Sequence, residues 1–358
     1  MTIRALSVRP FDLPLTRPIE TAAGVMDTSP IVLIDVLTDD GVTGHAYVRC
    51  YTPLALEPLA RLIANLEEPI VGLAADPAVV ETQLRRRFAL LGSQGLIGIA
   101  MAGIDMALWD ARARAAGEPL VRLLGGEPRP IPAYASLRAM EPGAAAAETE
   151  QALERGFDKV KVKIGGGALA DDLKAIRAVR AAAGDAIALM VDYNQSLSVD
   201  EALERARALD DEGLYWIEEP TRADDFAGHA RIAAAARTPI QLGENWWGAH
   251  DMEKSVAAAA SDHAMFDAMK IGGVSGWLRA AALAESSGLP ASSHAFPELS
   301  AQLLAVTPTC HLLEYAGGAG SIALEPLWIE DGHALIDDRP GSGLEWDEDA
   351  LARATAGP

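Results

Sequence analysis

Residues 158 to 165 read DKVKVKIG, in which Lys159, Lys161 and Lys163 alternate with valine and isoleucine. A period of two with β-branched residues at every other position is typical of a β-strand. The three lysines therefore lie on one face of the expected strand and the apolar residues lie on the other. A solvated edge strand could carry such a row, because lysine blocks edge-to-edge pairing. The alternative is a strand whose lysines face a cluster of negative charge.

The same texture recurs on both sides of this strand, as short apolar segments separated by polar loops and amphipathic helices. The expected strands end near AYASL, KVKVKIG, IALMVDYN, LYWIEEP, IQLGENW, FDAMKIGG, PASSHAF and HLLEY. Eight strands alternating with helices favour a parallel β/α barrel, although alternation alone leaves a doubly wound sheet open. The runs IGGG and AGGAGS lack the lysine and Ser/Thr of a phosphate loop, so we interpret them as turns.

The residue composition and the pattern of expected strands and helices change near residue 125. Before that point, SPIVLIDVLTDDGVTGHAYV predicts two strands joined by an Asp-Asp-Gly turn, and residues 54–123 are rich in Ala, Leu and Arg and predict helices. This part is expected to be a small α+β unit. A length of 358 residues fits one barrel of about 250 residues together with such a partner.

Composition limits the class of protein. A formal charge of −21 argues against a nucleic-acid partner, whose phosphates need Lys and Arg. No tract is long and apolar enough to span a bilayer, so we expect no membrane partner, and the N-terminus lacks the apolar core of an export signal. Cys50 and Cys310 are the only cysteines, which suits a reducing compartment. We therefore expect a cytoplasmic protein that acts on a small molecule.

Each expected strand from KVKVKIG onward ends near one ionisable side chain. Successive members of this series are 20 to 29 residues apart, which is about the length of one βα unit. Because barrel active sites are built from the carboxyl ends of several strands, these side chains should converge in one mouth. Lys161 shares the inward face, whereas Lys159 lies deeper and is given no chemical role. The series consists of Lys163, Asp192, Glu218, Glu244, Asp267, His294 and Glu314.

Four consecutive members of the series are carboxylates, and the first three of them come from three consecutive strands at nearly equal spacing. Taken singly, Asp192 could be a helix N-cap, and Glu218 with Glu219 could form a solvated corner before a proline. Taken together, Asp192, Glu218 and Glu244 offer the all-oxygen ligation that Mg²⁺ prefers. Neighbouring residues on a strand point to opposite sides, so only one of the tandem glutamates can bind the metal, and we expect Glu218.

The motifs as a set resemble the mandelate racemase subgroup of the enolase superfamily. The resemblance covers essentially the whole chain and implies an α/β fold with a modified TIM barrel, (β/α)7β. It implies an α+β capping domain at residues 1–125, the barrel at 126–318, and a C-terminal segment, 319–358, that packs back on the capping domain. The resemblance also implies a homo-oligomer, such as an octamer. The motifs are KVKIG, VDYNQS, WIEEPT, GENWWG, DAMKIGGVSGW, SSHAF and HLLEY, with PIVLIDV, GHAY, YTPLAL and AGIDMALWD in the capping domain.

The resemblance also implies a role for each residue that matches these motifs. Mg²⁺ is expected on the three carboxylates, a lysine serves as one base, and a His–Asp dyad serves as the other. The implied roles are metal ligation by Asp192, Glu218 and Glu244, base and neighbour roles for Lys163 and Lys161, the dyad Asp267–His294, a hydrogen bond from Glu314 to the substrate carboxylate, and substrate contacts from Ser136 and Asn194.

Two bases on different strands predict 1,1-proton transfer, in which one base removes an α-proton and the other returns a proton to the opposite face. The expected activity is a Mg²⁺-dependent racemase acting on a 2-hydroxy carboxylate through an enediolate. The same bases can run a dehydration, as the acid sugar dehydratases of this subgroup do. A catalytically silent barrel scaffold is the third possibility.

The substrate group distal to the carboxylate is expected beneath residues 16–30, TRPIETAAGVMDTSP, a loop that closes over the site in this family. Its residues Ile19, Ala23, Val25 and Met26, together with Tyr51, are mostly apolar, which favours an aryl or alkyl 2-hydroxy acid because unpaired hydroxyls are costly to bury. Glu20 on the same loop does not fit this interpretation. Ala295 and Ala316 replace leucines of mandelate racemases, which widens the pocket.

Overall fold

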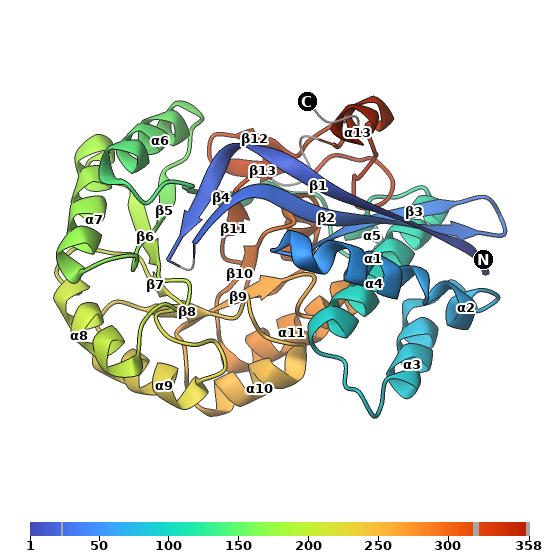
Figure 1. Ribbon diagram of the computed structural model, residues 1–358, viewed down its shortest axis with the longest axis horizontal. Coiled ribbons are helices and arrows are strands. Elements are labelled where there is room, and N and C mark those ends of the chain that lie inside the picture. Colours follow the sequence, from blue (N-terminus) through green and yellow to red (C-terminus); the bar gives the residue numbers. More distant parts are fainter. Residues whose placement is uncertain (23, 318–321, 356–358) are drawn as a thin grey trace.

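The computed structural model describes residues 1–22, 24–317 and 322–355. A closed barrel with helices on its outside lies beside a smaller α+β unit, the capping domain (Figure 1). The capping domain contains a three-stranded antiparallel sheet with the order β1-β2-β3. Its strands are β1 (Ile3–Thr21), β2 (Gly24–Thr38) and β3 (Thr43–Arg49), and the last two form the hairpin predicted around the Asp-Asp-Gly turn.

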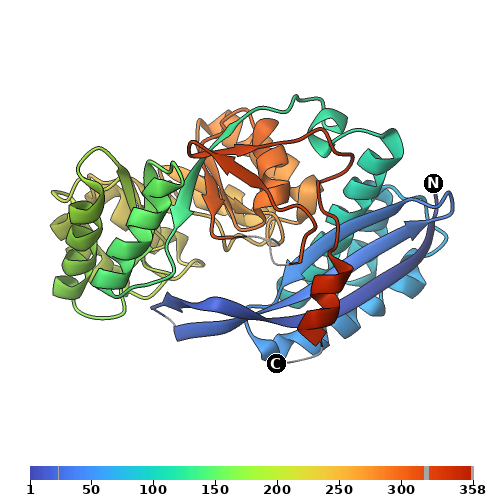
Figure 2. The ribbon, with the colours of Figure 1, turned by 90° about the horizontal axis from the view of Figure 1, so that it is seen from above.

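The segment that was expected to be a loop over the barrel is instead the end of a long hairpin. Strands β1 and β2 remain paired as far as Ile19 with Met26 and Thr21 with Gly24, with an irregularity between Pro14 and Ile19. This two-stranded extension, here called the hairpin arm (residues 13–31), reaches from the capping domain across the barrel (Figures 1 and 2). Backbone pairing, which a loop would lack, positions the arm. Ala23 lies outside the described residues.

Helices follow the capping strands, as the composition of residues 54–123 predicts. Asp76 caps α3 by accepting hydrogen bonds from the backbone N–H groups of Ala78 and Val79, with Pro77 at the first helical position. The longest helix, α4, ends at Gly117, whose φ of 71° suits glycine. No described helix is long and apolar enough to cross a membrane. These elements are η1 (Pro53–Ala55), α1 (Leu56–Ala64), α2 (Glu67–Ile70), α3 (Pro77–Arg87), α4 (Gly95–Ala116) and α5 (Leu120–Leu123).

The eight predicted barrel strands are all present and run parallel. Strands β4 to β10 pair in sequence order, and β11 returns to pair with β4. Backbone hydrogen bonds close the ring, from Ser293 N to Leu312 O at 3.0 Å and from His311 N to Ala291 O at 2.9 Å. An open doubly wound sheet is thereby excluded. The strands are β4 (Ile131–Ser136), β5 (Lys159–Lys163), β6 (Ala188–Asp192), β7 (Ile217–Glu218), β8 (Ile240–Leu242), β9 (His263–Asp267), β10 (Ala291–His294) and β11 (Leu313–Tyr315).

One helix follows each of the first seven barrel strands, which confirms the (β/α)7β architecture. These helices cover the outside of the barrel (Figure 1). Local signals set their ends, as where Ser198 and Glu201 form a capping box at the start of α8. The helices are α6 (Pro142–Glu154), α7 (Leu169–Ala183), α8 (Val199–Leu209), α9 (Phe226–Ala235), α10 (Ala249–Ala257), α11 (Gly273–Ser287) and α12 (Pro297–Ala305).

The C-terminal segment contains a short hairpin that was not predicted, formed by β12 (Trp328–Glu330) and β13 (His333–Leu335), and β13 pairs antiparallel with β4. The final helix, α13 (Glu348–Thr355), lies across the capping strands (Figure 2). Trp346 Nε1 donates to Asp35 Oδ1 at 2.8 Å, and Arg9 pairs with Glu348 at 2.8 Å. The end of the chain thus contacts the capping sheet.

Candidate active site

The register of the parallel strands places the predicted residues side by side. Lys163 on β5 is the ladder partner of Asp192 on β6, and Asp192 is in turn the partner of Glu218 on β7. On the other side of the barrel, Asp267 on β9 is the partner of His294 on β10. Residues spread over 150 positions of the sequence therefore meet at the carboxyl ends of the strands.

Asp192, Glu218 and Glu244 form one acidic group. Each offers an oxygen atom, these oxygens lie within 4.8 Å of one another, and all three residues are buried. Burial raises the pKa of Asp192 and of Glu218, and repulsion from Glu244 adds to the effect, although Lys161 opposes it. Trp216 holds Glu218 through a hydrogen bond from Nε1 to Oε2 of 3.0 Å. An all-oxygen group with this unbalanced negative charge fits Mg²⁺.

Glu219 lies outside that group. The amide of Asn245 donates to both of its carboxylate oxygens at 2.8 Å, and the positive φ of 38° at Glu219 marks the end of the strand. Asn245 Nδ2 also lies 3.3 Å from Glu244 Oε1. Glu219 is buried and its pKa is raised well above the usual value, first by burial and then by Glu244. The structure therefore places Glu219 in an adjoining hydrogen-bond network.

Lys161 is fully enclosed among acidic groups. Its Nζ lies 2.5 Å from Glu218 Oε1, 2.9 Å from Glu314 Oε1 and 3.8 Å from Asp192 Oδ2. Burial alone lowers the pKa of Lys161, but the charges of Glu218 and Glu314 outweigh it and raise the pKa above its ordinary value. Lys161 is therefore a fixed positive charge, so the lysine row faces carboxylates and does not form a solvated edge. Lys159 pairs with Asp158 at 2.5 Å, away from this cluster.

Lys163 and two predicted substrate contacts lie around the same centre. Lys163 Nζ donates to the carbonyl oxygen of Leu137 at 3.2 Å, a neutral partner that leaves the ammonium free of any ion pair among the described residues. Ser136 is buried beside Lys161 in the strand register. Asn194 donates from Nδ2 to Asp192 Oδ2 at 2.8 Å, and its buried Oδ1 has no hydrogen-bond donor in the described part of the chain. That oxygen is available to a ligand.

His294 is held by its neighbour on β9. Its Nδ1 lies 2.7 Å from Asp267 Oδ2, while Nε2 lies 3.4 Å from Glu244 Oε2. Burial lowers the pKa of His294, but the charges of Glu244 and Glu314 and the bond to Asp267 raise it to about 9. Asp267 also accepts backbone N–H bonds from Met269 and Lys270. The dyad therefore orients the imidazole with Nε2 toward the carboxylate group.

Glu314 lies between the two bases. It accepts from Lys161 Nζ and from the backbone N–H of Ala295 at 3.1 Å. Burial raises its pKa, but the positive charges of Lys161, His294 and Lys163 outweigh this and hold the pKa well below the usual range. Without substrate, Glu314 is thus an ionised acceptor. The expected donor role needs a proton that is gained with an anionic ligand, and it stays a prediction.

The space beneath the hairpin arm, where an apolar group of the substrate was expected, is lined by both apolar and charged residues. A cavity of about 240 Å³ lies beneath the hairpin arm and includes Ile19, but Arg49 of β3 and Arg138 of the loop after β4 also line it. Met26 is the strand partner of Ile19, and Tyr51 donates to Asp267 Oδ2 at 3.4 Å. Glu20 accepts from the backbone N–H of Met140 at 2.7 Å, which ties the arm to the barrel.

Lys270 and Asn245, which were not predicted from the sequence, link the metal side of the site to the dyad. Lys270 Nζ donates to Asn245 Oδ1 at 2.5 Å and lies 4.7 Å from the centre of the Tyr51 ring. Asn245 directly follows Glu244, and Lys270 lies three residues after Asp267. These positions were the available signal in the sequence. Tyr134, whose ring lies 5.4 Å from Lys161 Nζ, had no comparable signal because it faces the barrel interior.

Known proteins share these features along the whole chain. Residues 4–125 match the mandelate racemase / muconate lactonizing enzyme N-terminal domain, and residues 144–350 match the enolase C-terminal domain-like family. A Bradyrhizobium enolase, crystallised with magnesium and mandelic acid, is 45% identical with a TM-score of 0.93, and 98% of each chain is covered.

Two characterised relatives are each 32% identical. One is the 3,6-anhydro-alpha-L-galactonate cycloisomerase of Streptomyces coelicolor, where the match covers 97% of this chain and 98% of the relative. The other is the L-talarate/galactarate dehydratase of Salmonella typhimurium, with 94% and 87% covered. Structural neighbours carry bound magnesium, and the acidic group described above suits the same ion. The chain belongs to the mandelate racemase subgroup of the enolase superfamily, and its cofactor is Mg²⁺.

Proposed function

We propose that the protein is a racemase or epimerase that inverts the α-carbon of a 2-hydroxy carboxylate by 1,1-proton transfer. One observation carries the proposal: two basic side chains reach the acidic centre from strands that are not neighbours, each with its own support. Lys163 comes from β5 and is held by the Leu137 carbonyl, and His294 comes from β10 and is held by Asp267.

The chain's own residues supply most of what the reaction needs. Removing the α-proton of a carboxylate leaves a dianionic enediolate, whose charge must meet positive groups that are already in place. Lys161 provides one such fixed charge at the centre of the site. Mg²⁺, held by Asp192, Glu218 and Glu244, supplies Lewis acidity when bound. Lys163 and His294 then move protons on the two faces of the carbon.

Dehydration is the second candidate, and the relationship to L-talarate/galactarate dehydratase favours it. In that reaction one base removes the α-proton and His294, as a protonated imidazole, donates to a departing β-hydroxyl group. The two candidates differ in the product, since dehydration yields a 2-keto acid after tautomerisation and racemisation does not.

A screen of single enantiomers of 2-hydroxy acids and acid sugars tests the proposal. Each acid is incubated with the Mg²⁺-loaded protein, and optical rotation and 2-keto acid are measured together. We expect loss of rotation without keto acid for at least one acid. Keto acid from sugar acids, with unchanged rotation of every other acid, would replace the racemase with a dehydratase.

A further inference from the structure

The cavity beneath the hairpin arm adjoins the proposed reaction centre through three short stretches of chain. Arg49 lies two residues before Tyr51, which contacts Asp267. Arg138 directly follows Leu137, whose carbonyl oxygen holds Lys163. Ala316 lies two residues after Glu314. Residues that line this cavity of about 240 Å³ are thus close in the chain to residues of the reaction centre, and we take the cavity as the space for the ligand atoms beyond the first carboxylate.

Both arginines of this cavity lack an acidic partner. Arg49 donates to Ser29 Oγ at 3.3 Å, and Arg138 donates to the carbonyl oxygens of Arg17 and Ala316, each at 3.1 Å. Within residues 1–22, 24–317 and 322–355, neither guanidinium group forms an ion pair with a carboxylate. Glu148 accepts the backbone N–H of Arg138 instead. The two side chains are positioned by neutral oxygens, and their charge remains unmatched.

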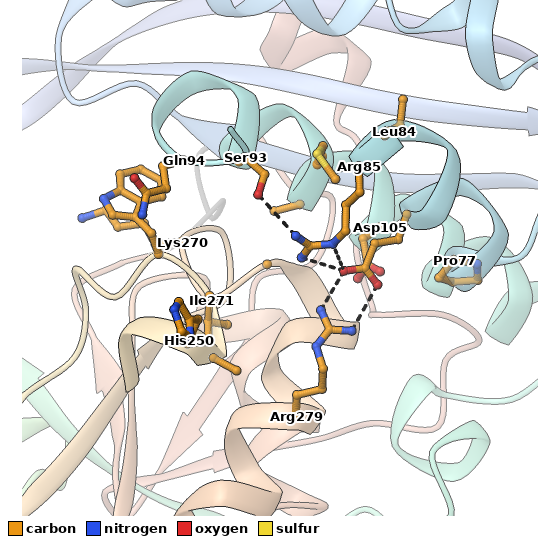
Figure 3. A pocket seen from close by; sticks show the side chains of 18 of the residues that line it. Pro77, Leu84, Arg85, Ser93, Gln94, Asp105, His250, Lys270, Ile271 and Arg279 are labelled. Atoms are coloured by element: carbon orange, nitrogen blue, oxygen red, sulfur yellow. Dashed lines mark hydrogen bonds and ion pairs between the residues drawn. The ribbon is translucent and has the colours of Figure 1, made fainter. Parts of the chain in front are cut away.

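A second cavity of the molecule shows the opposite arrangement. It has a volume of about 340 Å³ and lies between α3, α4 and α11, where the capping domain meets the barrel (Figure 3). There Glu81 pairs with Arg85 at 2.8 Å and with Arg279 at 2.9 Å, so the protein itself supplies the anion between two arginines. Beneath the hairpin arm, Arg49 and Arg138 donate to neutral oxygens instead. The comparison of the two cavities indicates that a ligand supplies the anion beneath the arm.

Electrostatics supports the same interpretation. Burial lowers the pKa of Arg138, the charge of Glu148 opposes this, and the nearby positive charges of Arg49 and Arg17 lower the pKa further. Two like charges at one cavity are unfavourable until an anion lies between them. Guanidinium groups bind carboxylates through paired N–H donors, so a carboxylate is the anion whose shape fits best.

We propose that Arg49 and Arg138 bind a second carboxylate of the substrate, which is then a 2-hydroxy dicarboxylate. The proposal rests on the proposed function, because it takes the first carboxylate to lie at Lys161 and Glu314. In this proposal a carboxylate takes the place of the aryl or alkyl group that Ile19 and Met26 predict. Binding of an alkyl acid as tightly as the dicarboxylate is the test result that would favour the apolar group.

Calorimetric titration of the Mg²⁺-loaded protein with matched acids tests this inference. Malate and 2-hydroxybutyrate share a four-carbon chain and a 2-hydroxy carboxylate, and they differ in one distal carboxylate. 2-Hydroxyglutarate and 2-hydroxypentanoate form the five-carbon pair. We expect at least one dicarboxylate to bind more than about 10-fold tighter than its partner. Equal or tighter binding of the monocarboxylate in both pairs would overturn the inference.

Variants locate the preference. Arg49→Gln and Arg138→Gln should each weaken the dicarboxylate about 10-fold or more, with the monocarboxylate changed less than about twofold, which also shows that the variant is folded. Arg86→Gln, at an exposed arginine of α3 that does not line the cavity, is the control and should keep the preference. Equal weakening of both acids in a pair would contradict the proposed contact.

Exchange of the α-hydrogen in D₂O separates this inference from the proposed function. If monocarboxylates exchange and dicarboxylates have no advantage, only the distal subsite is wrong. If none of the acids that bind exchanges, the proposed function fails, while the binding preference still tests the two arginines.

Discussion

The barrel mouth and the cavity beneath the hairpin arm differ in how their charges are matched. At the mouth, Lys161 contacts Glu218 and Glu314 and His294 contacts Asp267, although Lys163 contacts a neutral carbonyl oxygen. Beneath the arm, Arg49 and Arg138 contact neutral oxygens only, within the described residues. The mouth is therefore built before any substrate arrives, whereas the cavity is completed by a ligand. We therefore expect the barrel to carry the reacting groups. Substrate preference is expected to depend on the cavity between the barrel and the capping domain.

The largest effect is expected from the acidic group of the mouth. Glu218→Gln removes a charge from the centre of the group and should weaken Mg²⁺ binding by more than about 100-fold and abolish activity. Glu219→Gln is the matched control, because its carboxylate is bonded to Asn245, and it should retain binding within about 10-fold. Titration calorimetry with Mg²⁺ measures both. The reverse order would mean that the strand register of the site is wrong by one residue.

Metal removal tests the same region in the unaltered protein. A ligand that binds only the folded state stabilises it, by about 2.7 kcal/mol when its concentration is 100 times Kd. Millimolar Mg²⁺ should therefore raise the melting temperature of protein that was treated with EDTA, and should restore α-proton exchange. A melting temperature that does not respond to Mg²⁺ would favour the silent scaffold.

A smaller effect is expected where the hairpin arm meets the barrel. Glu20→Gln weakens the bond to the Met140 N–H, which is worth about 1.5 to 3 kcal/mol when the acceptor is charged. Because the arm covers the cavity and leaves the bases untouched, KM should rise about 3- to 10-fold with little change in kcat. A fall in kcat at constant KM would show that the arm shapes the reaction centre as well.

The smallest effect concerns the joint between the two parts, and it appears as a pH dependence of stability. Asp105 of α4 accepts from Ser275 at the start of α11. Burial raises the pKa of Asp105 to about 7, although the hydrogen bonds from Ser275 oppose this, and Glu81 and Arg279 have smaller, opposite effects. The folded state thus holds a proton that the unfolded chain, with a pKa of about 3.9, releases. Stability should fall as the pH rises from about 4 to 7.

Asp105→Asn removes that titration and should flatten the decline in melting temperature between about pH 4 and pH 7. Glu285→Gln, at an exposed carboxylate of α11, serves as the control and should keep the slope of the parent protein. An unchanged slope in Asp105→Asn would show that Asp105 is ionised throughout this range.

Much of the barrel mouth could be predicted from the sequence, because parallel strands turn a linear spacing into neighbours in space. Lys163, Asp192 and Glu218 recur at the length of one βα unit, so they had to meet at one end of the barrel. The alternation of Lys161 with valines likewise indicated its inward face. Both patterns are local and periodic, so they can be recognised without knowing how the two domains pack.

The cavity beneath the arm could not be predicted in the same way. Arg49 and Arg138 are far apart in the sequence and are brought together only when the capping domain docks on the barrel. The pairing of β1 with β2 beyond Pro14 also continues through a segment that the family resemblance implied to be a loop. Glu20 shows the same limit, since its partner, the Met140 N–H, belongs to the other domain.

The account depends most directly on whether Lys163 and His294 act on opposite faces of one carbon. The measurement is α-hydrogen exchange in D₂O, followed by NMR for each enantiomer of a substrate with His294→Asn. Racemisation should fall by about 10²- to 10⁴-fold, while one enantiomer alone still exchanges with retention of configuration. Lys163→Ala should exchange only the other enantiomer. Racemisation by His294→Asn near the parent rate, or equal exchange of both enantiomers, would contradict the two-base account.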